Sequence, residues 1–170
     1  WLFCGAKSFR GAKDSELLGF EKQRAVNSLD FVFGGVEKNA KIIIEDKRKA
    51  ELSGKKLSSA AALAGEFYAI VFSPADLNLI NDGPAVRRRF LDTAIGQLYP
   101  IYNEKLRNYY KAVAQRNSIL RDIKYNSDVE YFLDDFETSL ATLSKEIIKY
   151  RLRYVEILGD TTPELYSGIS

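Results

Sequence analysis

The strongest candidate for binding chemistry in these 170 residues is a run of three arginines after a Gly-Pro pair: Arg87, Arg88 and Arg89. Pro84 suits the first turn of a helix, with Asp82 or Gly83 as the cap. A helix N-terminus attracts phosphate through its free N–H groups, so these arginines can bind the phosphate backbone of DNA. Neighbouring helical residues point about 100° apart, so at most two of the three meet one backbone together. Contact with another protein lobe, or internal ion pairs with Asp82 or Asp92, are the alternatives.

A phosphate-binding loop of the form G-x-x-x-x-G-K-[ST] does not occur in the sequence. The nearest stretch, Ser53-Gly54-Lys55-Lys56, lacks the first glycine and the terminal hydroxyl. Such a loop needs glycines for close backbone approach, a lysine for the terminal phosphates and Ser or Thr for magnesium. The sequence therefore predicts that these residues alone neither bind ATP in the usual way nor act as an enzyme.

Composition excludes several classes of site. There is no histidine, so imidazole bases, His-containing zinc sites and Ser-His triads are excluded. The single cysteine, Cys4, excludes internal disulfides and fits a reducing, cytoplasmic compartment; on its apolar stretch we expect a buried, inert thiol. No apolar run approaches the roughly 18 residues of a membrane span. The net charge of +2 is too small to indicate nucleic-acid binding.

Charge is nevertheless unevenly distributed. Residues 99–124 carry six basic residues against two acids, and residues 126–139 carry five acids and no base. Complementary blocks on adjacent helices usually pair within the molecule, and we favour that interpretation over a DNA-binding patch.

The first third of the sequence has strand patterns. Leu29, Phe31 and Phe33 alternate with other residues as in a half-buried strand, and Gly34-Gly35 ends the pattern. Shorter strands are expected over 41–45 and 48–52, which predicts an antiparallel meander.

Two further elements are expected before the arginines. An Ala-rich helix over 60–64 would be capped by Ser58 or Ser59 and ended by Gly65. A buried strand over 68–72 would stop at Ser73-Pro74, because proline cannot donate to a ladder.

From Asp82 onward the pattern is helical. The first helix has an apolar stripe of Val86, Phe90, Ala94 and Leu98. The second begins at Pro100 and the third runs from Val129 to Ile157, both with apolar residues at alternating four- and three-residue spacing. A connector of about three residues, 125–127, means that these two long helices must lie antiparallel. Pro163 is expected to end the segment.

Arg116 interrupts the apolar seam of the second helix. Folding back at residues 125–127 sets Arg116 opposite Phe136 or Glu137, so we expect an ion pair with Glu137. If that carboxylate is partly buried, Arg116→Ala should cost roughly 1–3 kcal/mol. Tyr102, Tyr109, Tyr150 and Tyr154 also fall on the seams and are interpreted as core residues rather than base-stacking platforms.

A resemblance to a known family rests on several stretches of the sequence. They are Ala6–Arg10, the segment Ala69–Asp92 that ends in the three arginines, Gln97–Pro100, Ala114–Asn117, and Tyr150–Glu156 with Pro163–Ser170. Together they resemble the RecF family of bacterial recombination mediators, whose head belongs with the Rad50, SMC and ABC-type ATPases. The resemblance covers nearly the whole chain.

The resemblance implies a mixed α/β fold class: part of an ABC-type ATPase head lobe, plus a helical lobe with a long antiparallel hairpin. Residues 1–80 would belong to the ATPase lobe, 81–162 to the helical arm and 163–170 to a return segment. It also implies that the phosphate-binding loop precedes Trp1, and that the signature motif and catalytic acid follow Ser170. This chain would then be the middle of a longer protein.

The resemblance further implies peripheral nucleotide contacts. Related ATPases place a glutamine-containing loop, which senses magnesium and the γ-phosphate, after the strand that precedes Ser73. Here no glutamine is present, and Ser73 and Asp76 are the only polar candidates for that role. The same two residues equally fit a helix cap and a turn. By this resemblance Arg10 would reach a phosphate from a loop beside the nucleotide, although a solvent-exposed arginine is the more ordinary interpretation.

The function implied is ATP- and Mg²⁺-dependent DNA binding by a slow ATPase. An ATP-dependent homodimer would act at single-strand/double-strand junctions with RecO and RecR. Two rivals remain. Another SMC- or Rad50-like head would need a long coiled coil near Asn126, where only a short connector stands. A helical interaction module without nucleotide would leave the apolar strands without a partner layer.

Overall fold

The computed structural model describes residues 2–5, 8, 11–71, 74–123 and 133–169. By its contacts the chain divides into two compact units, Trp1–Pro100 and Ile101–Ser170. The described elements, in chain order, are α1 (Leu2–Gly5), η1 (Asp14–Leu17), β1 (Ala25–Phe33), β2 (Val36–Ile44), β3 (Lys49–Leu52), β4 (Lys55–Lys56), η2 (Ala60–Leu63), η3 (Pro74–Leu79), α2 (Pro84–Leu98), α3 (Pro100–Asp122) and α4 (Leu133–Ser167).

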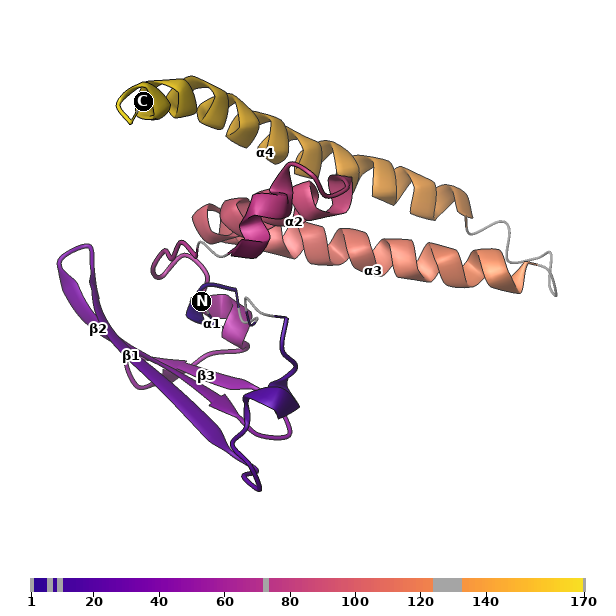
Figure 1. The fold of residues 1–170 in the computed structure, drawn as a ribbon. Helices are drawn as coiled ribbons and strands as arrows, with labels where there is room; N and C mark the ends of the chain where they lie inside the picture. Colours follow the sequence, from indigo (N-terminus) through magenta and orange to yellow (C-terminus); the bar gives the residue numbers. More distant parts are fainter. Residues whose placement is uncertain (1, 6–7, 9–10, 72–73, 124–132, 170) are drawn as a thin grey trace. The chain divides into compact units, whose positions relative to one another are not determined.

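The strands of the first unit form one antiparallel sheet in the order β1-β2-β3-β4 (Figure 1). β1 and β2 pair from Ala25 opposite Ile44 to Phe33 opposite Val36. Their two-residue turn, Gly34-Gly35, has both φ angles positive, at 61° and 78°, as the tight primed hairpin turns require. The predicted meander is confirmed, with β1 and β2 longer than the sequence pattern indicated. Sequence reasoning missed the two-residue β4.

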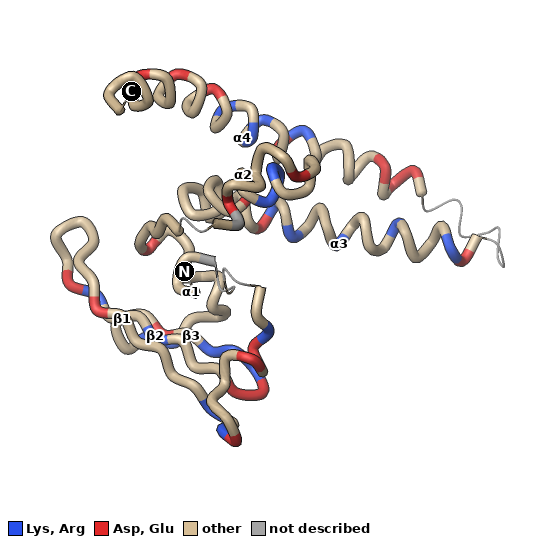
Figure 2. The backbone as a smooth tube through the Cα atoms, viewed as in Figure 1, with Lys and Arg blue, Asp and Glu red and all other residues tan. Residues whose placement is uncertain are grey.

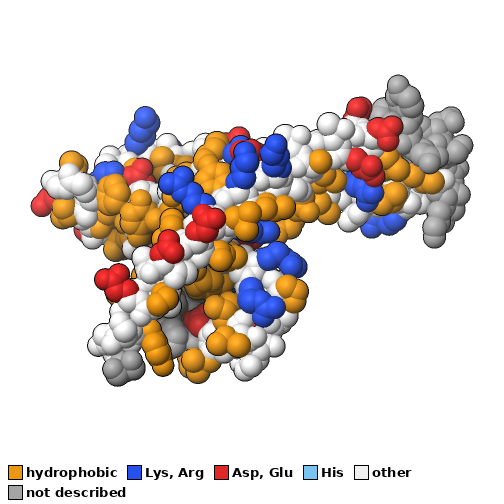
Figure 3. All heavy atoms as spheres, turned by 90° about the horizontal axis from the view of Figure 1, so that it is seen from above, with side chains coloured by type: hydrophobic (Ala, Val, Ile, Leu, Met, Phe, Trp, Pro, Cys, Tyr) orange, Lys and Arg blue, Asp and Glu red, His pale blue; other side chains and the backbone are white. Residues whose placement is uncertain are grey.

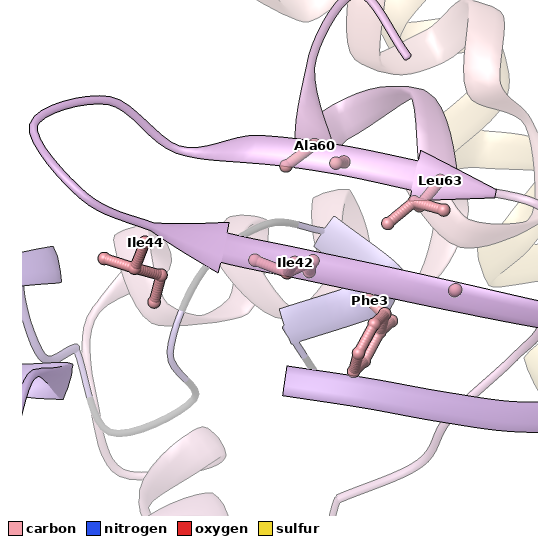
Figure 4. Packing of buried hydrophobic residues seen from close by; sticks show 7 residues of the cluster. Phe3, Ile42, Ile44, Ala60 and Leu63 are labelled. Atoms are coloured by element: carbon pink, nitrogen blue, oxygen red, sulfur yellow. The ribbon is translucent and has the colours of Figure 1, made fainter. Parts of the chain in front are cut away.

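One face of the sheet carries the core of this unit. Ala40, Ile42 and Ile44 on β2 have no exposed surface, and Phe3 of α1 and Leu63 of η2 pack against the same cluster (Figure 4). Because side chains alternate across a strand, the inward set on β2 follows the period of two. The helical turns α1 and η2 therefore supply the partner layer that the apolar strands need.

The segment that precedes the arginine-bearing helix differs from the prediction. Residues 68–71 form no strand, so the predicted strand over 68–72 is wrong within the described residues; Phe72 lies outside them. The segment is apolar but has no described strand beside it, and Ile70 is 97% exposed. A strand requires a ladder partner as well as a composition. The Ala-rich helix is a single 3₁₀ turn whose cap residue, Ser59, makes no side-chain capping hydrogen bond.

The helix α2 begins where the sequence predicts, with Gly83 as N-cap and Pro84 in the first turn. Its buried residues, however, lie in the last turns: Ile95 has no exposed surface and Gln97 is 8% exposed. The predicted apolar stripe of α2 does not form a buried face, because Val86, Phe90 and Leu98 are all exposed. An apolar stripe identifies a face that can be covered, but it does not identify the element that covers it.

The second unit is an antiparallel pair of helices. Contacts between α3 and α4 join Arg116 to Glu137, Lys105 to Glu146 and Tyr102 to Tyr150. Residue numbers fall on one helix as they rise on the other, which confirms the predicted antiparallel pairing. The predicted connector at 125–127 lies outside the described residues.

The predicted aromatic seam is confirmed for Tyr102 and Tyr150. Tyr102 is fully buried, its ring meets that of Tyr150 edge-on at 5.4 Å, and its hydroxyl accepts a hydrogen bond from Arg151 Nε at 3.2 Å. Tyr109 and Tyr154 are half-buried. Tyr102 and Tyr150 are thus packing residues, and the core interpretation of Tyr109 and Tyr154 stays a prediction.

Charged residues of both signs lie along the part of the pair where α3 ends and α4 begins (Figures 2 and 3). The first turn of α4 carries Asp134 and Asp135, which favour a helix N-terminus. Across the pair, Arg116 Nη2 donates to Glu137 Oε1 at 3.0 Å. The intramolecular interpretation of the complementary blocks is confirmed at this position.

The Arg116–Glu137 pair is more exposed than expected, which changes its predicted energy. The side chains are 31% and 58% exposed, so water screens the pair. We now expect Arg116→Ala to lower the free energy of unfolding by less than about 1 kcal/mol. A double-mutant cycle with Glu137→Ala, measured by urea unfolding, should give a coupling energy of about 0.2–1 kcal/mol. A coupling energy well above that range would restore the buried-pair interpretation.

The helix α4 continues through Pro163 to Ser167, so the prediction that Pro163 ends it is wrong. A proline inside a helix removes one N–H donor, and its ring crowds the carbonyl four residues before it. That residue is Gly159, which itself disfavours a helix interior. The local sequence therefore indicates a helix end that the structure does not have.

The contacts place α2 in the unit that contains the sheet. The assignment of residues 1–80, 81–162 and 163–170 to an ATPase lobe, an arm and a return segment stays a prediction. A division by contacts does not say which lobe of a larger protein each element serves.

Candidate phosphate-binding surface

The three arginines on α2 have different surroundings. Arg87 Nη1 donates to the backbone carbonyls of Asp82, at 2.8 Å, and Ile80, at 3.3 Å. It therefore fastens the turn before α2 to the helix. The internal pairing expected for one arginine exists, but it reaches the backbone of Asp82 rather than a carboxylate.

Arg88 and Arg89 are exposed and, within the part of the chain that the structure describes, form no ion pair or side-chain hydrogen bond. Two adjacent guanidinium groups in the first two turns of a helix form a positive surface near its N–H groups. Such a surface suits phosphate. Arg88 and Arg89 are therefore the residues of α2 that are candidates for binding phosphate. Arg87 instead positions the start of the helix.

Of the other predicted site residues, Asp76 alone lies among the described residues. Asp76 lies exposed in the first turn of η3. Arg10 and Ser73 lie outside the described residues. Their proposed nucleotide contacts stay predictions.

Sequence reasoning missed a polar link at the other end of α2. The nearly buried Gln97 accepts a hydrogen bond from the Ala69 N–H at 2.9 Å through its Oε1 atom. This bond ties the segment 68–71 to the last turn of α2. The available signal was a glutamine between apolar residues at the end of a helix.

Gly65 lies close to the same link. It has a φ of +89°, and a Cβ there would come within 2.9 Å of Pro100 Cγ. Both the backbone angle and the close approach require glycine. Gly65 therefore fixes the path of the chain from η2 toward α2.

The described residues include no group of three His, Cys, Asp or Glu side chains placed to hold a metal ion. Cys4 is 3% exposed, and burial raises the pKa of its thiol. A raised pKa disfavours the thiolate, which supports the expectation of an inert cysteine. Among the described helices, none has the length and apolar content needed to span a bilayer.

Comparison with known proteins extends these observations. No family model matches the chain. The DNA replication and repair protein RecF of Clostridium perfringens strain SM101 is 33% identical over 171 residues, covering 99% of this chain and 46% of the relative. RecF of Caldanaerobacter subterraneus subsp. tengcongensis is 34% identical over 174 residues, covering 99% and 47%.

Solved structures agree with the sequence relatives. The recombination mediator RecF of the RecFOR pathway, solved with ATPrS, superposes with a TM-score of 0.90 at 31% identity. RecF with ATP superposes with a TM-score of 0.88 at 32% identity. Both matches cover 99% of this chain and 46% of the solved chain.

The mixed α/β fold, with its antiparallel sheet and helices, is that of part of an ABC-type ATPase head. Within that class, the chain matches proteins named RecF over nearly its whole sequence, at 31–34% identity. The chain spans about half the length of the relatives that it matches.

Proposed function

We propose that this chain serves in a DNA replication and repair protein of the RecF type, which binds DNA in an ATP-dependent manner. Acting with RecO and RecR in the cytoplasm, that protein would load recombinase at single-strand gaps. The observation that carries the proposal is the continuity of the match: 99% of the chain superposes on RecF solved with ATPrS.

The two rival functions have less support. A free-standing helical module does not account for the sheet core around Ile42 and Leu63. A different SMC- or Rad50-like head does not account for relatives at 30–34% identity that are named RecF.

In this proposal DNA contacts Arg88 and Arg89, while Arg87 holds the helix start. Arg10, Ser73 and Asp76 make peripheral contacts to ATP and its Mg²⁺. The main phosphate cradle comes from residues other than these 170, because the sequence contains no G-x-x-x-x-G-K-[ST]. Hydrolysis would be slow and coupled to dimerisation of two such proteins.

Calorimetry tests the nucleotide part of this proposal. We expect no Mg²⁺-dependent ATP binding to the isolated 170-residue chain, and binding to a longer protein that contains it together with a phosphate-binding loop. ATP binding to the isolated chain near micromolar affinity would contradict the expectation. A longer protein that also fails to bind ATP would remove the ATPase function altogether.

A further inference from the structure

A hollow of about 650 Å³ opens on the first unit. It lies where Ser8 and residues 11–14 meet the start of η2 and the second turn of α2. Its polar lining residues are Ser8, Asp14, Arg48, Ser59 and Arg89, and the others are glycine or alanine. Small residues leave room between the polar groups, so the hollow can admit a small anion.

Arg48 is held rigidly in this hollow. Its Nε donates to Asp14 Oδ2 at 3.2 Å and its Nη2 donates to Asp14 Oδ1, while its side chain is only 13% exposed. The pair occupies two of the five N–H donors of the guanidinium and leaves three for another acceptor. A guanidinium fixed in this way loses little entropy when it binds an oxyanion.

Two further groups complete the donor set. Ser59 is exposed, and its hydroxyl makes no capping bond to η2, although it occupies the N-cap position. Arg89 is exposed and free of ion pairs among the described residues. The charged residues of the lining are Arg48, Arg89 and Asp14, so the hollow carries a net charge of one positive unit.

We infer that this hollow binds a backbone phosphate of DNA, with Arg48, Ser59 and Arg89 as the contacts and Asp14 as the residue that positions Arg48. A phosphate takes donors from several directions at once, which matches two guanidinium groups and a hydroxyl on different elements. Arg89 follows Arg88 directly, so the hollow continues the arginine surface on α2. The inference rests on the proposed DNA binding and extends it to residues of the sheet unit.

Two neighbouring serines give a matched test. In the protein that contains this chain, Ser59→Asp puts a negative charge in the hollow, and Ser58→Asp puts the same charge one residue outside it. Both positions are exposed, so neither change should alter the melting temperature. We expect Ser59→Asp to weaken duplex binding about tenfold and to reduce the salt slope by about one, and Ser58→Asp to change affinity less than twofold.

The readout is fluorescence anisotropy of a labelled duplex at several salt concentrations, with ADP binding measured in parallel. Equal effects of the two substitutions on duplex affinity would overturn the inference while leaving the proposed DNA binding intact. Loss of ADP affinity without loss of DNA affinity would assign the hollow to a nucleotide phosphate instead and overturn the DNA assignment. No DNA binding by the unsubstituted protein would overturn both proposals.

Discussion

Replacing Arg88 and Arg89 together by alanine should weaken duplex DNA binding by about tenfold or more in the protein that contains this chain. Each arginine that neutralises one phosphate contributes close to one unit to the slope of log affinity against log salt, so the slope should fall by about two. Both side chains are exposed and make no described ion pair. The melting temperature should therefore stay unchanged.

Arg87→Ala is the matched control for that experiment. Arg87 binds the carbonyls of Asp82 and Ile80, so its loss should lower the melting temperature and change the salt slope little. An unchanged salt slope in the double variant, with a melting temperature lowered by several degrees, would show that all three arginines stabilise the fold and do not bind DNA.

The second large effect concerns the sheet core. Ile42→Ala should lower the free energy of unfolding by about 2–5 kcal/mol, because Ile42 has no exposed surface and a cavity would remain. The neighbouring Ile43 points to the other face of β2 and is only half-buried, so Ile43→Ala should cost less. Urea unfolding of the 170-residue chain measures both. Equal losses would contradict the register in which Ile42, and not Ile43, faces α1 and η2.

The sequence predicted best those features that depend on local pattern. The meander follows from alternation and from Gly34-Gly35, where the turn needs positive φ at both positions. The start of α2 follows from Gly83-Pro84, and the Arg116–Glu137 pair follows from the spacing of apolar residues along the two long helices.

Features that depend on contacts with other elements of the fold were predicted poorly. Residues 68–71 have the composition of a strand, but no described strand lies beside them. Val86, Phe90 and Leu98 form a stripe, yet the packing of the unit buries Ile95 instead. For the same reason the hollow around Arg48 could not be predicted: Asp14, Arg48, Ser59 and Arg89 are distant in sequence and meet only in the fold.

The dependence of DNA affinity on ATP tests the central claim most directly. A labelled single-strand/double-strand junction would be titrated with the protein that contains this chain, with and without Mg²⁺ and ATP, at a fixed salt concentration. A RecF-type function predicts that ATP tightens binding by about 5- to 150-fold, the usual range of coupling between two sites. Equal affinity in the presence and absence of ATP, in a protein that calorimetry shows to bind ATP, would contradict it.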